Sequence, residues 1–249
     1  MSKNNGYHPI QHSSRQPLFK QIWEDLIFAH WPVCKRSLQK IIPYPLKLDC
    51  YEKQAWISIV FLSVSGMYVN GIPFLSLFKP FQQINVRTYV TYQGIRGVFF
   101  LKIHASNFIA SRLATFFYHL PYTYSIISTD NDQNRYSYMC SQKQRQLSPL
   151  LHAHFTIDDQ EFIPHNEDFA SFLVNRYCLF IVNKHNNVYR GDLLHEPWLL
   201  RKGTCISFDS SSFFGQNLSI IKEQPIVHYS SKKDALLWRL VNTANIKQL

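Results

Sequence analysis

The sequence contains few charged residues, and acidic residues are the scarcer kind. Charged side chains make up 17% of the 249 residues, whereas roughly 25% is usual for soluble domains. Lysine and arginine number 26 against 16 aspartates and glutamates, which gives a net charge of +10. Because 46% of the residues are hydrophobic, global disorder is excluded, since disorder requires low hydrophobicity and high charge.

Several sequence signatures of enzymes and metal sites are absent. There is no Gly-x-Gly-x-x-Gly, P-loop or Gly-x-Ser-x-Gly motif. The five cysteines include no Cys-x-x-Cys pair, so neither a disulfide framework nor a zinc finger is predicted. His152 and His154 would share one face of a strand, but no third ligand is visible. We therefore predict no metal and no cofactor.

Membrane insertion and dedicated nucleic-acid binding are not predicted. Trp56–Phe78 has no charged residue and is long enough to span a membrane, but Gly66, Asn70, Gly71 and Pro73 interrupt it. The start of the chain lacks the apolar segment of a secretory signal, so we expect a cytoplasmic protein. The basic residues form only short, scattered clusters without a nucleic-acid-binding module. Attraction of polyanions to the basic surface remains a further alternative.

Most of the chain is predicted to form strands. Residues 1–16 resemble a loose arm, and residues 17–249 are expected to form one domain. Leu18–Trp31 has helical spacing, and Ser106–His119 is a second predicted helix. The buried stripe of that second helix would comprise Phe108, Ile109, Leu113, Phe116 and Phe117. Between and after these helices, short alternating segments form four predicted hairpins. This favours a mainly β (α+β) fold with an antiparallel, closed or nearly closed sheet.

The hairpin from Ile84 to His104 carries the most informative side chains. Asn85, Arg87 and Tyr89 share one face of its first strand, and Phe100, Lys102 and His104 share one face of the second. With a four-residue turn, Arg87 would lie opposite Lys102, Asn85 opposite His104 and Tyr89 opposite Phe100. One face of the hairpin would then be aliphatic and the other polar.

Two interpretations of this polar face remain open. It is either an ordinary solvated surface or the wall of a cavity. In a cavity, Arg87 and burial would lower the pKa of Lys102, and a neutral lysine can attack a carbonyl to form a Schiff base. Arg87 could also hold a carboxylate through two hydrogen bonds, while Tyr89 or His104 would transfer a proton. The aromatic rings of Tyr89 and Phe100 favour the cavity.

Eight short motifs, taken together, resemble those of a known family. They are His30-Trp31-Pro32, Asn85-Val86-Arg87-Thr88-Tyr89-Val90, Gly97-Val98-Phe99-Phe100, Leu120-Pro121-Tyr122, Arg176-Tyr177-Cys178, Tyr189-Arg190-Gly191, His195-Glu196-Pro197-Trp198 and His228-Tyr229-Ser230. In order and spacing, from about residue 23 to 240, the chain resembles the YqjF-like family of uncharacterised bacterial proteins. That family is placed in the acetoacetate decarboxylase-like superfamily. The resemblance implies a mostly antiparallel, cone-shaped β-barrel with a central cavity and a few peripheral helices.

The resemblance does not imply decarboxylation. The decarboxylase of the superfamily uses two adjacent lysines, and this hairpin has only Lys102, near the place of that pair. Gln83 stands where the family usually has a glutamate. Arg176, Arg190 and His195 belong to matched motifs, and they would either bind an anionic group in the cavity or brace the fourth hairpin.

We therefore predict a central pocket that binds a small anionic or carbonyl-bearing ligand, such as a keto acid. Its ligand-binding residues would be Gln83, Asn85, Phe100, Arg176, Arg190 and His195. The alternative is a Schiff-base lyase, resembling a decarboxylase or aldolase, that uses Lys102 together with Arg87, Tyr89 and His104. The sequence leaves the oligomeric state open.

Overall fold

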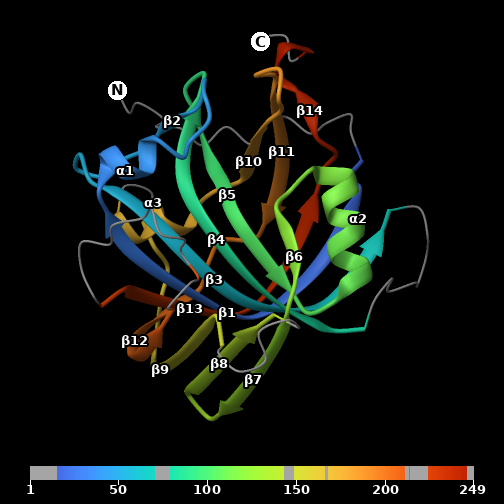
Figure 1. The fold of residues 1–249 in the computed structure, drawn as a ribbon. Coiled ribbons are helices and arrows are strands. Elements are labelled where there is room, and N and C mark those ends of the chain that lie inside the picture. Colours follow the sequence, from blue (N-terminus) through green and yellow to red (C-terminus); the bar gives the residue numbers. More distant parts are fainter. Residues whose placement is uncertain are drawn as a thin grey trace.

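The computed structural model describes residues 16–70, 79–142, 149–165, 168–210, 213 and 224–245. As predicted, the described chain is mainly β (Figure 1). Its strands are β1 (Phe19–Val33), β2 (Lys47–Leu48), β3 (Ala55–Val69), β4 (Phe81–Tyr92), β5 (Ile95–Ala105), β6 (Tyr122–Tyr124), β7 (Ile126–Asp132), β8 (Arg135–Ser141), β9 (Leu151–Phe162), β10 (Cys178–Val182), β11 (Val188–His195), β12 (Leu200–Asp209), β13 (Ile226–Leu237) and β14 (Val241–Asn242). The helices are α1 (Lys35–Gln39), α2 (Phe108–Tyr118), α3 (Phe169–Val174) and the short 3-10 helix η1 (Thr243–Asn245). Of the predicted arm, residues 1–16, only Gln16 is described.

Seven of these strands pair in a closed cycle. The order is β1–β3–β4–β5–β10–β11–β13, and β13 pairs again with β1. The β5–β10 pairing is parallel and the other pairings of the cycle are antiparallel. The pairing of β1 with β13, from Phe19 opposite Leu237 to His30 opposite Ile226, joins the two ends of the described chain. The predicted closed, mostly antiparallel sheet is therefore present.

The remaining long strands extend the sheet from β13. β12 pairs with the first half of β13, and β9, β8 and β7 follow in that order. The ring of Phe61 on β3 lies 4.6 Å from that of Tyr138 on β8 and 5.2 Å from that of Phe155 on β9, between centroids. The extension therefore packs over one face of the cycle.

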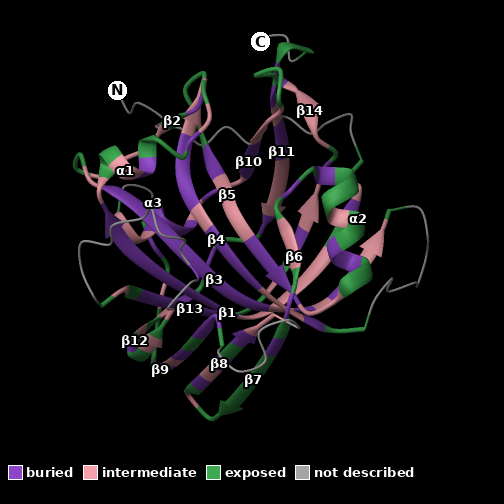
Figure 2. Ribbon diagram, viewed as in Figure 1, coloured by how far each residue is buried: buried purple, intermediate pink, exposed green. Residues whose placement is uncertain are grey.

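Two hydrophobic clusters cover the two faces of the cycle. One contains Ile84 and Val86 of β4, together with Phe155 of the extension. The other contains Tyr89 of β4 and Phe172 of α3. Both faces of the central strands are consequently buried, as the purple stretches of β3 and β4 show in Figure 2.

The prediction of a helix over Leu18–Trp31 is wrong, because this segment forms most of strand β1. Its spacing imitates a helix because the strand is interrupted and is then buried on both faces. The pairing with β3 shifts register between Glu24 and Ile27, and Asp25 has a positive φ of 51°. After that shift every residue to Val33 is buried, so the strand shows no alternation of apolar and polar residues.

Helix α2 is confirmed close to its predicted bounds, with Asn107 rather than Ser106 as its cap. The Asn107 side chain accepts a hydrogen bond from the backbone N–H of Ala110 at 2.9 Å. The prediction of a buried stripe is wrong, because Phe108, Ile109, Leu113, Phe116 and Phe117 are all exposed. The helix instead packs through its smaller residues and Tyr118.

The uncharged segment Trp56–Phe78 begins in strand β3, as predicted, and its residues 71–78 lie outside the described part. None of the helices in the described residues has the length and hydropathy needed to cross a membrane.

The β5–β10 junction leaves no room for a side chain at Gly97. A Cβ atom there would lie 2.8 Å from the Cys178 sulfur and 2.9 Å from the Cys178 carbonyl oxygen. We expect Gly97→Ala to lower the free energy of unfolding by about 1–3 kcal/mol, as measured by denaturant titration. Gly94→Asn in the turn of the same hairpin is the control, because Asn tolerates its φ of 78° and no atom lies within 4 Å. Equal stability of the two variants would contradict this account of the junction.

Candidate functional site

The β4–β5 hairpin has a two-residue turn and a register that differs from the prediction. Gln93 and Gly94 form the turn with positive φ angles. Beyond it, Arg87 pairs with Phe100. The register then shifts by one residue, so that Lys102 pairs with Val86 and His104 with Ile84. The predicted pairings of Arg87 with Lys102, Asn85 with His104 and Tyr89 with Phe100 are therefore wrong.

This shift divides the predicted site between two faces of the sheet. Asn85, Arg87, Tyr89 and Phe100 lie on one face, here called the Arg87 face, as their alternation along β4 and the pairing with Phe100 require. Lys102 and its pairing partner Val86 lie on the opposite face, here called the Lys102 face, and so does His104. Arg87 and Lys102 are thus not neighbours across the hairpin, contrary to the prediction.

On the Arg87 face, three adjacent strands bring polar side chains into one row. His30 of β1 pairs with Ser58 of β3, and Ser58 pairs with Arg87 of β4. His228 of β13 pairs with Phe28, two residues from His30, and the two imidazole rings lie 5.5 Å apart between centroids. We call His30, Ser58, Arg87, Tyr89 and His228 the inner polar cluster.

Arg87 is the cation of this cluster, and no described residue supplies a counter-charge for it. Its Nε and Nη2 atoms are buried and have no hydrogen-bond partner among the residues that the structure describes, while other parts of the side chain remain accessible. Among the described residues no carboxylate forms an ion pair with it; its guanidinium lies 5.7 Å from the centroid of the Phe28 ring. Burial lowers the pKa of Arg87. Two unpaired N–H groups on a desolvated cation are costly, so this side chain is suited to receive an anion.

A hydrogen-bond chain sets the tautomer of His30. The Tyr89 hydroxyl donates to the carbonyl oxygen of Leu173 in α3 at 3.0 Å. Because its single proton is used there, Tyr89 accepts from His30 Nδ1, also at 3.0 Å. Burial, with smaller contributions from His228 and Arg87, lowers the pKa of His30. His30 is therefore neutral, and its buried, unpaired Nε2 is a free acceptor.

Two further histidines near this row are also kept neutral. Burial lowers the pKa of His228 to about 4, and its Nδ1 atom has no partner. Burial likewise lowers the pKa of His195 to about 4. Its Nδ1 lies 2.7 Å from the Glu196 carbonyl oxygen, to which it donates, and its ring packs 4.2 Å from that of Trp198.

Gln83 and Asn85 form a second polar group on β4. The Gln83 amide donates to the Asn85 side-chain oxygen at 2.8 Å. The Tyr122 hydroxyl in turn donates to Gln83 at 3.3 Å. These amides thus satisfy one another, and Asn85 lies two residues from Arg87 on the same face.

The other two predicted arginines have partners of their own. Arg176 contacts Asp49 at 2.5 Å and donates from Nε and Nη2 to the Phe172 carbonyl oxygen. Arg190 pairs with Asp192 at 2.5 Å. Both arginines are buried and paired with a carboxylate, although Asp49 is shared with Arg96. Their contacts are those of bracing residues.

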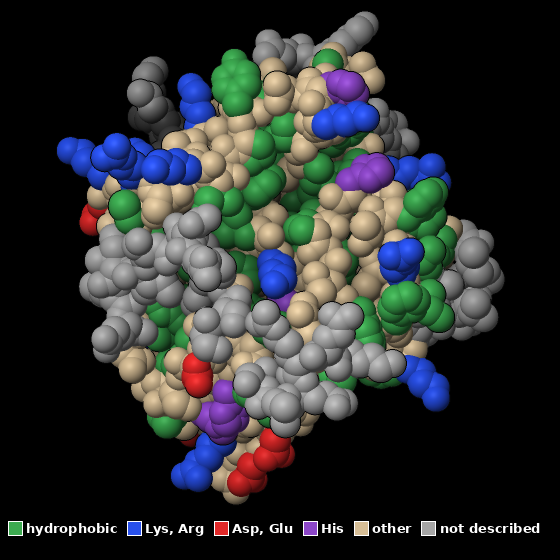
Figure 3. Space-filling view, in the orientation of Figure 1, with side chains coloured by type: hydrophobic (Ala, Val, Ile, Leu, Met, Phe, Trp, Pro, Cys, Tyr) green, Lys and Arg blue, Asp and Glu red, His purple; other side chains and the backbone are tan. Residues whose placement is uncertain are grey.

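The Lys102 face carries a separate group of polar side chains. His104 is fully buried, and its Nδ1 lies 2.7 Å from the Ser125 hydroxyl while its Nε2 has no partner. Burial lowers the pKa of His104 to about 3, with a smaller effect of Lys102. Lys102 itself is half-buried on β5. Figure 3 shows that hydrophobic side chains line a hollow in the middle of the face viewed there, with a basic side chain at its lower edge.

The inner polar cluster includes residues to which the sequence assigned no role. His30, Ser58 and His228 come from β1, β3 and β13. Two of them belong to the quoted motifs His30-Trp31-Pro32 and His228-Tyr229-Ser230. These residues could have been found from the sequence only by placing the His30 and His228 motifs beside the Arg87 motif. That placement depends on the pairing of β1 with both β3 and β13.

Comparisons with known proteins agree with the resemblance and with the fold. Residues 20–234 match the family model DUF2071, described as an uncharacterized conserved protein. Over 223 residues the chain is 30% identical to uncharacterized protein YqjF of Bacillus subtilis (strain 168), covering 90% of this chain and 91% of YqjF.

Two solved structures show the same fold at low identity. Acetoacetate decarboxylase from Legionella pneumophila matches with a TM-score of 0.66 and 13% identity, over 97% of this chain and 98% of that one. The enduracididine biosynthesis enzyme MppR, complexed with pyruvate, matches with a TM-score of 0.66 and 9% identity over the same shares. The chain therefore belongs to the DUF2071 family, is similar to YqjF, and has an acetoacetate decarboxylase-like fold.

Proposed function

We propose that this protein binds a small carboxylate-bearing ligand, and that Arg87 holds the carboxylate. The observation that carries this proposal is the pair of buried, unpartnered nitrogens on Arg87. Nε–H and Nη2–H form one edge of the guanidinium, which matches the two oxygens of a carboxylate. Such a ligand would supply both missing hydrogen bonds and the missing negative charge.

The rest of the inner polar cluster suits a ligand with one further polar group. His30 Nε2 offers an acceptor and His228 Nδ1 an unpaired ring nitrogen. Since both imidazoles are neutral, they add no positive charge, and one carboxylate balances the cluster. MppR, which has the same fold, is complexed with pyruvate, a carboxylate of the size that we propose. The ring of seven strands would be part of the predicted cone-shaped barrel around this site.

Binding is tested with pyruvate and its neutral amide, pyruvamide. We expect pyruvate to raise the melting temperature of the protein, because a ligand that binds only the folded state stabilises it. Pyruvamide, which keeps the shape but not the charge, is expected to have little effect. Equal shifts with both compounds, or a flat response across a panel of small carboxylates, would contradict the proposal.

Replacing Arg87 separates a ligand-binding arginine from a structural one. We expect Arg87→Met to abolish the pyruvate-dependent shift and, without ligand, to leave the free energy of unfolding unchanged or raise it by about 1 kcal/mol, since an unpaired charge is removed. The matched control is Arg176→Met, which breaks a buried ion pair and should cost about 3 kcal/mol. Both values come from denaturant titration. A large loss of stability in Arg87→Met would assign Arg87 a structural role.

The neutral histidines make stability depend on pH. The pKa of His228 is about 4 in the folded protein and about 6.5 when unfolded. Between these values the unfolded state binds more protons, so stability falls as the pH falls, by about 1.4 kcal/mol per pH unit for each such histidine. We expect His228→Gln to reduce this pH dependence of the unfolding free energy by the contribution of one histidine. The free energy is measured by denaturant titration at pH 7, 6 and 5. His185→Gln, at an exposed turn, should leave the slope unchanged; an unchanged slope in His228→Gln would refute the burial argument.

Lys102 supports a second candidate function, Schiff-base chemistry on its own face. Lys102 is half-buried on β5, and the buried His104 follows two residues later on the same face. The lysine amine would condense with a ketone to give an imine and water. Protein incubated with acetoacetate and borohydride would then carry a reduced adduct on Lys102, located by mass spectrometry, and Lys102→Met would carry none. Absence of an adduct across several keto acids would remove this candidate and leave the Arg87 proposal intact.

A further inference from the structure

The exposed face of β9 carries a pair of histidines that the proposed function does not use. His152 and His154 are alternate residues of the strand, so both side chains lie on the same face. Their Nε2 atoms lie 3.0 Å apart, and the ring centroids are 4.4 Å apart. In the protein without metal, this distance is explained by one imidazole donating its proton to the other.

The same distance also fits two ligands of one metal ion. Imidazole nitrogens bind transition metals at about 2.0–2.1 Å, and two nitrogens 3.0 Å apart then subtend an angle of about 90° at the metal. This is the angle between neighbouring ligands in the tetragonal geometry of Cu²⁺. Tetrahedral coordination would require the nitrogens to be about 3.4 Å apart.

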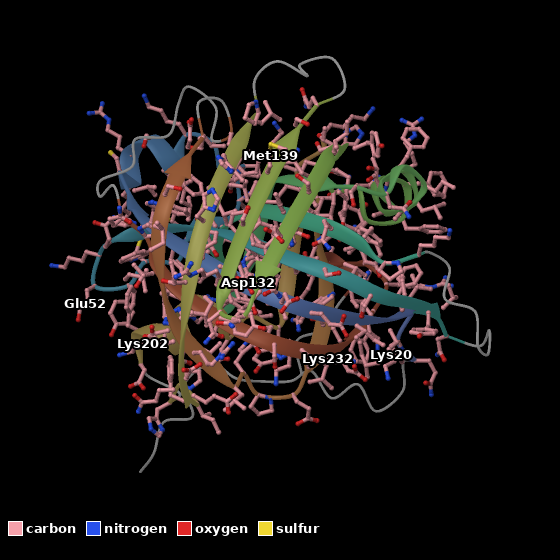
Figure 4. All side chains as sticks on the ribbon, turned by 90° about the horizontal axis from the view of Figure 1, so that it is seen from below. Lys20, Glu52, Asp132, Met139, Lys202 and Lys232 are labelled. Carbon is pink, nitrogen blue, oxygen red and sulfur yellow. The ribbon has the colours of Figure 1, made fainter. Side chains whose placement is uncertain are left out.

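The strands on either side of β9 present further donors. His152 pairs with Asp209 on β12, which is exposed and negatively charged. On its other side it pairs with Met139 on β8, which is labelled in Figure 4 and is 45% exposed. The described residues contain no preformed group of three His, Cys, Asp or Glu ligands. Asp209 therefore acts as a nearby negative charge, and water completes the coordination.

We propose that His152 and His154 form a surface site for Cu²⁺, with Asp209 strengthening it electrostatically. When the metal binds, the ring that donated its Nε2 proton carries that proton on Nδ1 instead, so that both rings coordinate the metal through Nε2 and no proton is lost. This site is independent of the Arg87 site.

The test is a titration of the whole protein with Cu²⁺, followed by calorimetry and electron paramagnetic resonance. His8 and His12, in the first 15 residues, are replaced by glutamine in every sample so that they do not compete. We expect one equivalent to bind, with a spectrum showing two coupled nitrogens. Either His152→Gln or His154→Gln should weaken binding at least tenfold and leave at most one coupled nitrogen. Asp209→Asn should weaken it a few-fold while keeping both nitrogens.

The matched control is His185→Gln, which removes an exposed histidine elsewhere and should change neither affinity nor spectrum. The melting temperatures of all variants are expected to match, because His152 is exposed and His154 only half-buried. The proposal is overturned if Cu²⁺ binds equally well to the protein with both His152→Gln and His154→Gln. It is also overturned if the spectrum of the parent protein shows a single coupled nitrogen.

Discussion

The desolvated guanidinium of Arg87, which has no carboxylate beside it in the described part of the chain, is the constraint that organises the candidate site. Acidic residues are scarce in this chain, and those near the other buried arginines are already used: Asp49 by Arg176 and Asp192 by Arg190. Arg87 instead faces two neutral imidazoles, a tyrosine and an aromatic ring. Neutral neighbours cannot compensate its charge, and this is why we propose that a bound anion does so.

The position of the inner polar cluster depends on two features of the sheet, the closed cycle of strands and the register shift in β5. The closed cycle of strands brings β1, β4 and β13 close enough for His30, Arg87 and His228 to share one face. The register shift after Phe100 then places Lys102 and His104 on the other face. Two chemically distinct regions, one cationic with acceptors and one with a primary amine, are thus separated by the thickness of a single sheet.

Sequence patterns predicted the local part of this arrangement and failed for the non-local part. The alternation along β4 correctly placed Asn85, Arg87 and Tyr89 on one face, because it depends only on neighbouring residues. The register of Lys102 depends on one extra residue in β5, which no residue type announces. β1 was mistaken for a helix because it is buried between two partner strands, so tertiary pairing overrides the spacing of its apolar residues. Without β1 as a strand, the place of His30 beside Arg87 could not be derived.

The pairing of β1 with β13 also has a consequence for synthesis of the protein. Phe19 pairs with Leu237, nearly the full length of the chain away. The cycle therefore cannot close until β13 has been synthesised. Until then β1 and β3, which are apolar on both faces in their central parts, lack their full set of partner strands. Such long-range pairing makes folding slow and exposes unpaired strand edges. The unpaired edges of the amino-terminal strands are thus the part of the nascent chain most exposed to aggregation until β13 joins them.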